Sequence, residues 1–556
     1  MRWYRFVLML AMAVLLPIVP LQAGGPSEGS IPPGFWWGTV LSTHSVEGGH
    51  QNNWTAWEAV PGHIADGRIS GMACNHWELF SEDQKWMKEL GQNAVIVSLE
   101  WSRIEPQPRQ YDQAAIDHYR SMLKSLRSQG IEPVVVLWDR TLPAWVASYG
   151  GLEAPAIILD FADYSKVVAK NFGDLVDVFV PLRDPVGAVD KAYKLNINPP
   201  GKCDLAACAK SLVVLLAMHR GAREAILAND LTAVSGKKPA EVGIIAGMRF
   251  TRPNRPDNPM DVGLARANAG ISSFAFVDAL LKGDLALGTP PQPGPKGFGK
   301  LPTNQQPTPP NYDHRVADFI VVQYEGLEEI RFNLLMPLFT EKVIPPGASL
   351  DGAGQVIFAD GLSALLASLA RYPVPLMVMV TAADSGALDR GAFLKSHAQA
   401  VKKALGQGVN IRGFFYDSLL CGFDYERGFA TQRGLLRVNY PVQERSLAPG
   451  ADAFKALAIP GAEDDSLPPT SVPGGTAGDS SAGDPALIAP PADSGRDVGM
   501  SAGHTPNGPV AVKKPAKKTV TKTTSEPPAA RKNRPKKPTK ASAAVPLPPM
   551  KPSEAY

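Results

Sequence analysis

Between residues 33 and 440, short apolar runs alternate with longer amphipathic stretches. The apolar runs are rich in β-branched residues and lack polar alternation, which predicts strands that are buried on both faces. These runs are Asn93–Leu99, Pro133–Leu137, Leu175–Leu182, Glu241–Ala246, Ala317–Gln323, Pro375–Val380 and Ile411–Tyr416. The stretches Ala114–Ser128, Asp160–Phe172 and Ala206–Asn229 lie between them and are predicted helices.

This alternation predicts an α/β fold. Strands that alternate with helices form a parallel sheet, because each crossover helix returns the chain to the same edge. The number of repeats fits a closed (β/α)8 TIM barrel better than an open, doubly wound sheet. We therefore predict one barrel over residues 31–455.

The first residues have the pattern of an export signal. Arg2 and Arg5 precede the apolar run Phe6–Leu21, and small residues follow at Ala23 and Gly24. This order is typical of a secretory signal peptide over residues 1–23; an uncleaved N-terminal anchor is the alternative. The expected location is secreted, periplasmic or at the cell envelope.

The composition changes after residue 461. Residues 461–556 are rich in Pro, Ala, Gly, Ser and Thr, which predicts a disordered tail. Residues 513–540 hold eleven Lys or Arg and the single acid Glu526, so the rest of the chain has 45 basic and 52 acidic residues. By charge alone this stretch could dock on an anionic envelope polymer, and we predict no specific nucleic-acid partner. A solvated tail without a partner is the alternative.

The four cysteines fit an oxidising compartment. Cys203 and Cys208 lie five positions apart in a loop-like stretch, which predicts a local disulfide. Cys74 and Cys421 are predicted to be small buried side chains. The sequence has no cluster with metal-ligand spacing and no glycine-rich phosphate loop, so we expect no metal and no cofactor.

Several phrases resemble glycoside hydrolase family 1, the β-glucosidase-like enzymes. In the family they read F-x-W-G-x-A-T-S, Q-x-E-G, N-x-W-x-x-W-E, S-I-E-W-S-R-I-x-P, L-P-x-W-L, R-G-Y-x-x-W-S-L and G-Y-x-x-R-F-G-L. The similar segments here are Phe35–Ser42, Val46–Gly49, Trp54–Glu58, Ser98–Pro106, Leu142–Val146, Arg412–Leu420 and Gly428–Leu436. The resemblance implies a TIM barrel that retains configuration through a carboxylic acid and a carboxylate nucleophile.

The resemblance places Asp184 at the acid/base position. The family phrase T-x-N-E-P corresponds to Val180–Pro185, with Asp184 for Glu and Arg183 for Asn. The Asp side chain is one methylene shorter, which retracts the proton by roughly 1.5 Å. If Arg183 paired with Asp184, it would also hold the acid in its ionised form.

The nucleophile phrase T-E-N-G has two possible counterparts. Anchoring on Thr381 places Ala382 at the nucleophile, whereas anchoring on Gly386 places Asp384 there. Glu325 is a further candidate on another strand. The sequence leaves these alternatives open.

Other positions of the family's sugar pocket also differ. Ile96 stands where the family has an arginine beside the nucleophile. The candidate substrate-binding residues are Ser45, Asp139, Arg183, Tyr324, Asp417, Asp424 and Tyr425.

Two hypotheses follow from these differences. The first is an exported homologue that is impaired in ordinary hydrolysis and acts on or binds carbohydrate in the barrel cleft. The alternative is a diverged β-glycosidase or transglycosylase with Asp184 as acid/base and Asp384 or Glu325 as nucleophile. It requires two carboxylates about 5 to 6 Å apart at the barrel mouth. A third, in which the basic tail is the functional part and the barrel a carrier, is also open.

Overall fold

A computed structural model describes residues 29–230, 234, 240–282, 316–384, 386 and 388–459. Within these ranges, eight parallel strand positions form a closed barrel. They are β1 (Trp36–Leu41), β2 (Ala94–Ser98), β3 (Glu132–Trp138), β4 (Val178–Leu182), β5 (Glu241–Val242) continued by β6 (Ile244–Pro253), β7 (Ile320–Phe332), β9 (Leu376–Thr381) and β10 (Ile411–Asp417). The predicted barrel is confirmed. The signal segment and the tail lie outside the described residues.

The barrel closes because each strand has a parallel neighbour on both sides. β1 pairs with β2 and with β10, and the β5/β6 strand pairs with β4 and with β7. Every predicted strand is present. The first strand, β1, was missed because Trp36, Trp37 and Gly38 interrupt the β-branched pattern on which the prediction relied.

Alternate residues of each strand fill the barrel interior. On β2, Ala94 and Ile96 point inward, whereas Val95 and Val97 pack against the surrounding helices. The interior cluster comprises Val40, Ala94, Ile96, Val134, Val136, Val178, Val180, Ile245, Phe319, Val321, Met377, Met379 and Phe415. The barrel is therefore a packed core below its mouth.

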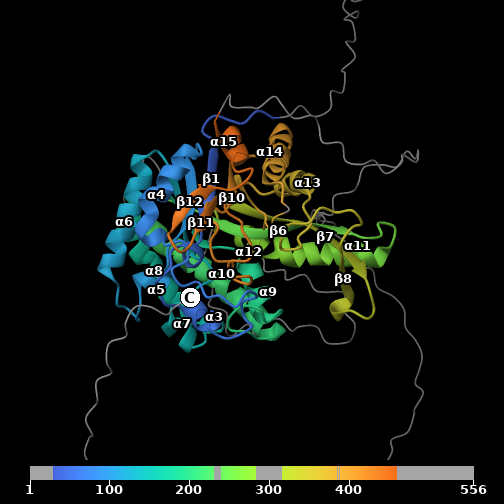
Figure 1. The fold of residues 1–556 in the computed structure, drawn as a ribbon. Coiled ribbons are helices and arrows are strands. Elements are labelled where there is room, and N and C mark those ends of the chain that lie inside the picture. Colours follow the sequence, from blue (N-terminus) through green and yellow to red (C-terminus); the bar gives the residue numbers. More distant parts are fainter. Residues whose placement is uncertain are drawn as a thin grey trace, which may run out of the picture. The chain divides into compact units, whose positions relative to one another are not determined.

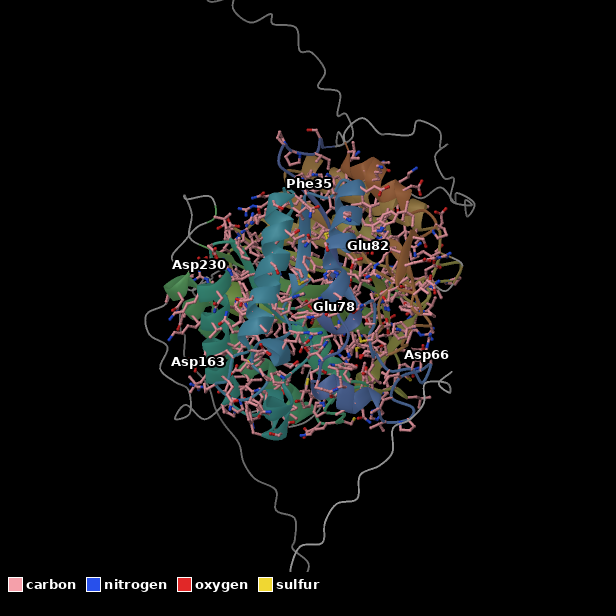
Figure 2. All side chains as sticks on the ribbon, turned by 60° about the vertical axis from the view of Figure 1, so that its left-hand side comes forward. Phe35, Asp66, Glu78, Glu82, Asp163 and Asp230 are labelled. Carbon is pink, nitrogen blue, oxygen red and sulfur yellow. The ribbon has the colours of Figure 1, made fainter. Side chains whose placement is uncertain are left out.

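Helices surround the strands (Figure 1). The long ones are α4 (His76–Glu89), α6 (Gln113–Ser128), α8 (Ile157–Phe172), α9 (Pro185–Tyr193), α10 (Leu205–Asn229), α11 (Pro259–Ala269), α12 (Ala275–Lys282), α13 (Ala359–Leu369) and α14 (Arg390–Gly406). Asp112, Asp204 and Asp389 cap α6, α10 and α14 by accepting hydrogen bonds from first-turn amides. Glu78 and Glu82 lie along α4 (Figure 2), whose buried side includes Asp83 and Met87.

Short elements complete the described fold. They are α2 (Thr43–Val46), α3 (Asn53–Glu58), α5 (Trp101–Ile104), α7 (Ala144–Ser148), η1 (Gly151–Glu153), η2 (Gly270–Phe274), η3 (Pro337–Phe339), α15 (Asp452–Ala458) and an antiparallel pair, β11 (Leu436–Asn439) and β12 (Glu444–Leu447). β7 runs beyond the barrel to Phe332 and pairs antiparallel with β8 (Thr340–Val343). The prediction ended this strand at Gln323, because the polar residues that follow do not have the pattern of a buried strand.

Among the described helices, α10 alone is long and apolar enough to cross a membrane by length and composition. Its buried residues include Leu215 and Met218, and it packs against α8 and α9. This is the arrangement of a core helix.

The predicted disulfide between Cys203 and Cys208 is not formed, and both thiols are free. Cys208 lies inside α10 and is buried in the core, whereas Cys203 is exposed and precedes the helix cap Asp204. The start of the helix therefore directs the two side chains to different surroundings. Cys74 and Cys421 are buried, as predicted.

Candidate active site

Polar side chains replace the apolar interior at the carboxyl ends of the strands. These residues line a cavity of about 310 Å³. Its lining includes Ser42, Ser45, Arg140, Arg183, Asp184, Lys191, Arg249, Gln323, Glu325, Thr381, Asp417, Asp424, Tyr425, Glu426, Arg427 and Arg433. Active sites of TIM barrels lie at this end of the strands.

Arg183 forms the floor of the cavity. Its guanidinium donates to Ser42 Oγ at 2.5 Å, Asp139 Oδ2 at 3.2 Å and Asp417 Oδ2 at 2.6 Å. It also donates to Gln323 Oε1 at 3.3 Å. Burial raises the pKa of Asp139, but the charges of Arg183 and Arg140, together with hydrogen bonds from two serines, outweigh this effect and lower the pKa below its ordinary value. Arg183 is therefore fully engaged by residues of four other strand ends.

Asp184 begins α9 at the end of β4. Its backbone is left-handed, with φ of 44°, and its side chain accepts a hydrogen bond from the Gly187 amide at 3.1 Å. Its nearest cation is Arg140, whose Nη2 lies 3.7 Å from Asp184 Oδ2. Arg183 does not pair with Asp184, because its guanidinium donates to Ser42, Asp139 and Asp417 instead. Burial and the nearby charge of Glu325 raise the pKa of Asp184 to about 6.

Glu325 reaches the same cavity from β7. It forms an ion pair with Arg249 of β6 and accepts a hydrogen bond from Gln323 Nε2 at 2.9 Å. Burial alone would raise the pKa of Glu325, but the charge of Arg249 and this hydrogen bond lower it. Glu325 is therefore held in its ionised form.

Gly247 of β6 lies close to both of these carboxyl groups. A Cβ at Gly247 would be 2.4 Å from Asp184 Oδ1 and 3.2 Å from Glu325 Oε1. The two oxygens are thus at most roughly 6 Å apart, and this upper limit includes the separation of about 5 to 5.5 Å between the carboxyl groups of retaining glycosidases. The structure brings together Asp184 and Glu325 of the three catalytic candidates.

Asp384 does not line the cavity. It forms an ion pair with Arg390 at 3.2 Å and accepts a hydrogen bond from the Gly386 amide at 2.7 Å. Ala382 is fully buried in the outer core, between the barrel and its helices. Neither anchoring of the nucleophile phrase therefore places a carboxylate in the cavity.

Thr381 is the residue of β9 that reaches the cavity. Arg433 Nη1 donates to its Oγ1 at 3.2 Å. The sequence analysis used Thr381 only to align the nucleophile phrase and did not predict that it faces the cavity, although the inward alternation of Met377 and Met379 extends directly to it.

The other substrate-binding candidates divide into two groups. Ser45, Asp417, Asp424 and Tyr425 line the cavity. Tyr324 does not, because it points outward from β7 and its hydroxyl donates to the Phe358 carbonyl oxygen at 2.6 Å.

Two aromatic and charged contacts fix the cavity wall near Tyr425. The Tyr425 ring stacks on the His44 ring, with their centroids 5.5 Å apart. The Arg140 guanidinium lies over the Tyr425 ring, 5.3 Å from its centroid. Arg433 holds Asp424 at 2.9 Å, and despite burial this charge lowers the pKa of Asp424 to about 2. Ile96 lies below, in the apolar barrel interior.

The sequence analysis also missed the cationic lining of the cavity. Its members are Arg140, Lys191, Arg249, Arg427 and Arg433. Arg140 follows Asp139 directly, and Arg249 lies two positions beyond Gly247 on β6, so strand alternation was the available signal. In the part of the chain that the structure describes, no three His, Cys, Asp or Glu side chains are grouped to hold a metal ion.

Comparison with known proteins finds similar sequences among glycosidases. The family Glycosyl hydrolase family 1 matches residues 27–292. Beta-glucosidase A of Acetivibrio thermocellus is 25% identical over 462 residues, covering 78% of this chain and 98% of that protein. Beta-glucosidase A of Thermotoga maritima is 25% identical over 444 residues, covering 74% and 94%.

The chain is a family 1 glycosidase homologue. Its fold matches the solved family 1 b-glucosidase from Thermotoga maritima with a TM-score of 0.69 and 22% identity, over 77% of this chain and 98% of that one. That enzyme has also been solved in complex with isofagomine lactam. Homologues of this family thus bind carbohydrate ligands.

Proposed function

We propose that this homologue cleaves glycosidic bonds in its barrel cavity, with Asp184 as acid/base and Glu325 as nucleophile. The observation that carries the proposal is the pair of carboxyl groups that both lie close to Gly247. Burial keeps one member protonated up to about pH 6, while an arginine keeps the other ionised. Two carboxyl groups whose environments separate their pKa values are suited to acid and nucleophile roles.

The reaction has two steps. In the first, Asp184 transfers its proton to the leaving oxygen, a Glu325 oxygen bonds to the anomeric carbon, and the glycosidic bond from that carbon to the leaving oxygen breaks, which releases the alcohol and gives an ester-linked sugar. In the second, Asp184 takes a proton from water, the water oxygen bonds to the anomeric carbon, and the ester bond to Glu325 breaks. Both residues return to their initial state.

The second candidate function is carbohydrate binding in the cavity without hydrolysis. The observation in its favour is the end of β9, where Thr381 presents a hydroxyl and the structure places no carboxylate. Arg183 also occupies the cavity floor with four hydrogen bonds. Turnover assays separate the two candidates.

The test uses the full chain and a panel of aryl β-glycosides. We expect Glu325→Gln to reduce kcat/KM at least about a hundredfold, and azide to restore turnover of Glu325→Gly as a glycosyl azide. Asp184→Asn should lose activity on poor leaving groups and keep much of the first step on dinitrophenyl glycosides, which need no acid.

A matched control comes from the same strand. Glu329 lies on β7 and forms an ion pair with Arg252, so Glu329→Gln removes the same charge away from the cavity and should leave kcat/KM within about twofold. Loss of turnover in Asp384→Asn with full activity in Glu325→Gln would contradict the proposed roles. No turnover by the unaltered chain, with retained sugar binding, would favour the second candidate.

We also propose that the chain is exported and acts at the cell envelope or beyond it. The support is the order of two arginines, the apolar run Phe6–Leu21 and small residues after it. The basic residues 513–540 would add charge attraction to anionic envelope polymers. Fractionation of cells that express the full chain, with N-terminal sequencing of the product, tests export. Removal of residues 513–540 tests retention.

A further inference from the structure

We propose that the sugar bound in this cavity carries an anionic group, a carboxylate or a phosphate, and that Arg140 binds it. This inference rests on the proposed function only in placing the sugar next to the carboxyl pair. The observation behind it is a guanidinium that faces the cavity with donors that the described residues leave free.

Arg140 is fixed at the cavity wall by its backbone and its ring contact. Its φ is 71°, a left-handed conformation that is rare for a side-chain-bearing residue, and its carbonyl oxygen accepts a hydrogen bond from Trp54 Nε1 at 3.3 Å. Its guanidinium lies 5.3 Å from the Tyr425 ring centroid, and 12% of its side chain is exposed. The group is therefore held in place and still open to the cavity.

Four of the other cations of the lining are engaged more closely, and the fifth, Arg427, donates a hydrogen bond to the Ala353 carbonyl oxygen at 3.4 Å. Arg183 has four acceptors, Arg433 donates twice to Asp424, and Lys191 and Arg249 pair with Glu426 and Glu325. Arg140 has an ion contact of 3.7 Å with Asp184, which exceeds hydrogen-bond length. Among the described residues, none accepts a hydrogen bond from its guanidinium.

This geometry fits an anion better than a neutral sugar. A guanidinium offers planar pairs of donors that match the two oxygens of a carboxylate or phosphate, and such bonds are about twice as strong as neutral ones. A hydroxyl of a neutral sugar would engage one donor at a time. The desolvated wall strengthens the preference, because charge interactions grow as water is excluded.

Binding of the anion would also prepare the acid. Arg140 is one of the charges that favour ionised Asp184. When its guanidinium binds a ligand anion, the anion offsets the positive charge of Arg140, and Asp184 loses part of that support. This loss favours the protonated carboxyl group, which is the form that donates to the leaving oxygen.

Equilibrium binding tests the inference without turnover. The probes are 4-nitrophenyl β-D-glucuronide, 4-nitrophenyl β-D-glucoside 6-phosphate and 4-nitrophenyl β-D-glucoside, titrated by calorimetry into the full chain carrying Glu325→Gln. We expect one anionic probe to bind at least about tenfold more tightly than the neutral glucoside. The tighter of the two anionic probes identifies carboxylate or phosphate as the source.

The variants assign this preference to Arg140. Arg140→Gln should abolish the tenfold difference between the anionic and the neutral probe, and Arg140→Lys should keep part of it. The control is Arg412→Gln, because Arg412 lies at the opposite end of the barrel, where β10 starts, and pairs there with Glu241. It removes the same charge and should keep the preference.

Equal binding of all three probes would overturn the inference, as would an anionic preference that survives Arg140→Gln. These outcomes are independent of the proposed reaction. An anionic preference lost in Arg140→Gln, in a chain that hydrolyses no glycoside, would leave the anion site standing and contradict the proposed hydrolysis. Hydrolysis of glycosides without any preference for the anionic probes would support the proposed hydrolysis and contradict the anion site.

Discussion

At the scale of single residues, the chemistry depends on two carboxyl groups with different pKa values. Asp184 must be protonated to act as the acid, and its pKa of about 6 follows from burial and the Glu325 charge. We expect kcat/KM to fall as the pH rises through about 6. It should also fall at low pH, where Glu325 becomes protonated below its ordinary range. A pH–rate profile that shows no loss of kcat/KM up to pH 8 would contradict the acid role.

The same titration predicts how stability changes with pH. In the unfolded chain the pKa of Asp184 is 3.8, whereas in the folded protein its pKa is about 6. Folding therefore binds protons between these values, and the contribution of Asp184 to stability decreases as the pH rises from 4 to 6. Asp184→Asn should gain roughly 2 to 3 kcal/mol relative to the unaltered protein over this interval. Urea denaturation at pH 4, 5, 6 and 7 measures the difference; parallel curves would contradict it.

Arg183 joins the residues at the bottom of the cavity that holds Asp184 and Glu325. Asp139 is buried, and Arg183 is its closest cation. Arg183→Met should reduce the free energy of unfolding by roughly 3 to 5 kcal/mol, because it leaves a buried carboxylate without its partner. The double variant with Asp139→Asn should recover part of this loss. Chemical denaturation of the three variants tests the coupling, and an additive double variant would argue against it.

At the scale of elements, strand alternation decides which residues reach the cavity. Thr381 of β9 faces the cavity, and Ala382 beside it packs in the outer core. We expect Thr381→Glu to fold and to place its carboxylate near Arg433, which already donates to Thr381. Ala382→Glu should lose several kcal/mol of stability, because it buries an unpaired charge.

Thermal unfolding of these two variants tests directly which residues of β9 face the cavity and which face the outer core. Similar losses in both would contradict the described alternation. Aryl glycoside turnover by Thr381→Glu adds a functional comparison, because this substitution supplies a carboxylate at the end of β9.

Periodicity in the sequence was enough to predict most elements of the barrel. Buried parallel strands have long apolar runs, so seven runs were recognised; β1 was missed because tryptophans and a glycine obscure its pattern. The site was predicted less well. Asp184 and Glu325 were candidates, but their closeness depends on Gly247, which belongs to a third strand. Tyr324 was misplaced because the family phrase was transferred without asking which side of β7 each residue faces.

At the scale of the whole molecule, the barrel is completed by α15. Phe454 of this helix is fully buried, and its ring packs edge-on against Trp37 of β1 at 6.5 Å. All barrel strands and α15 lie before Ile459. We therefore expect a chain that ends at Ile459 to unfold at the same temperature as the full chain.

A chain that ends at Gly450 is the matched comparison. It keeps every barrel strand and removes Phe454 with α15, so the aromatic contact with Trp37 is lost. Loss of a buried Phe side chain costs roughly 3 to 5 kcal/mol, which should lower the melting temperature by several degrees. Calorimetric scans of the three chains measure this order. If the chain ending at Ile459 were destabilised as much as the chain ending at Gly450, the segment after Ile459 would contribute to folding, and the barrel would not be the independent unit inferred from its strand pairing.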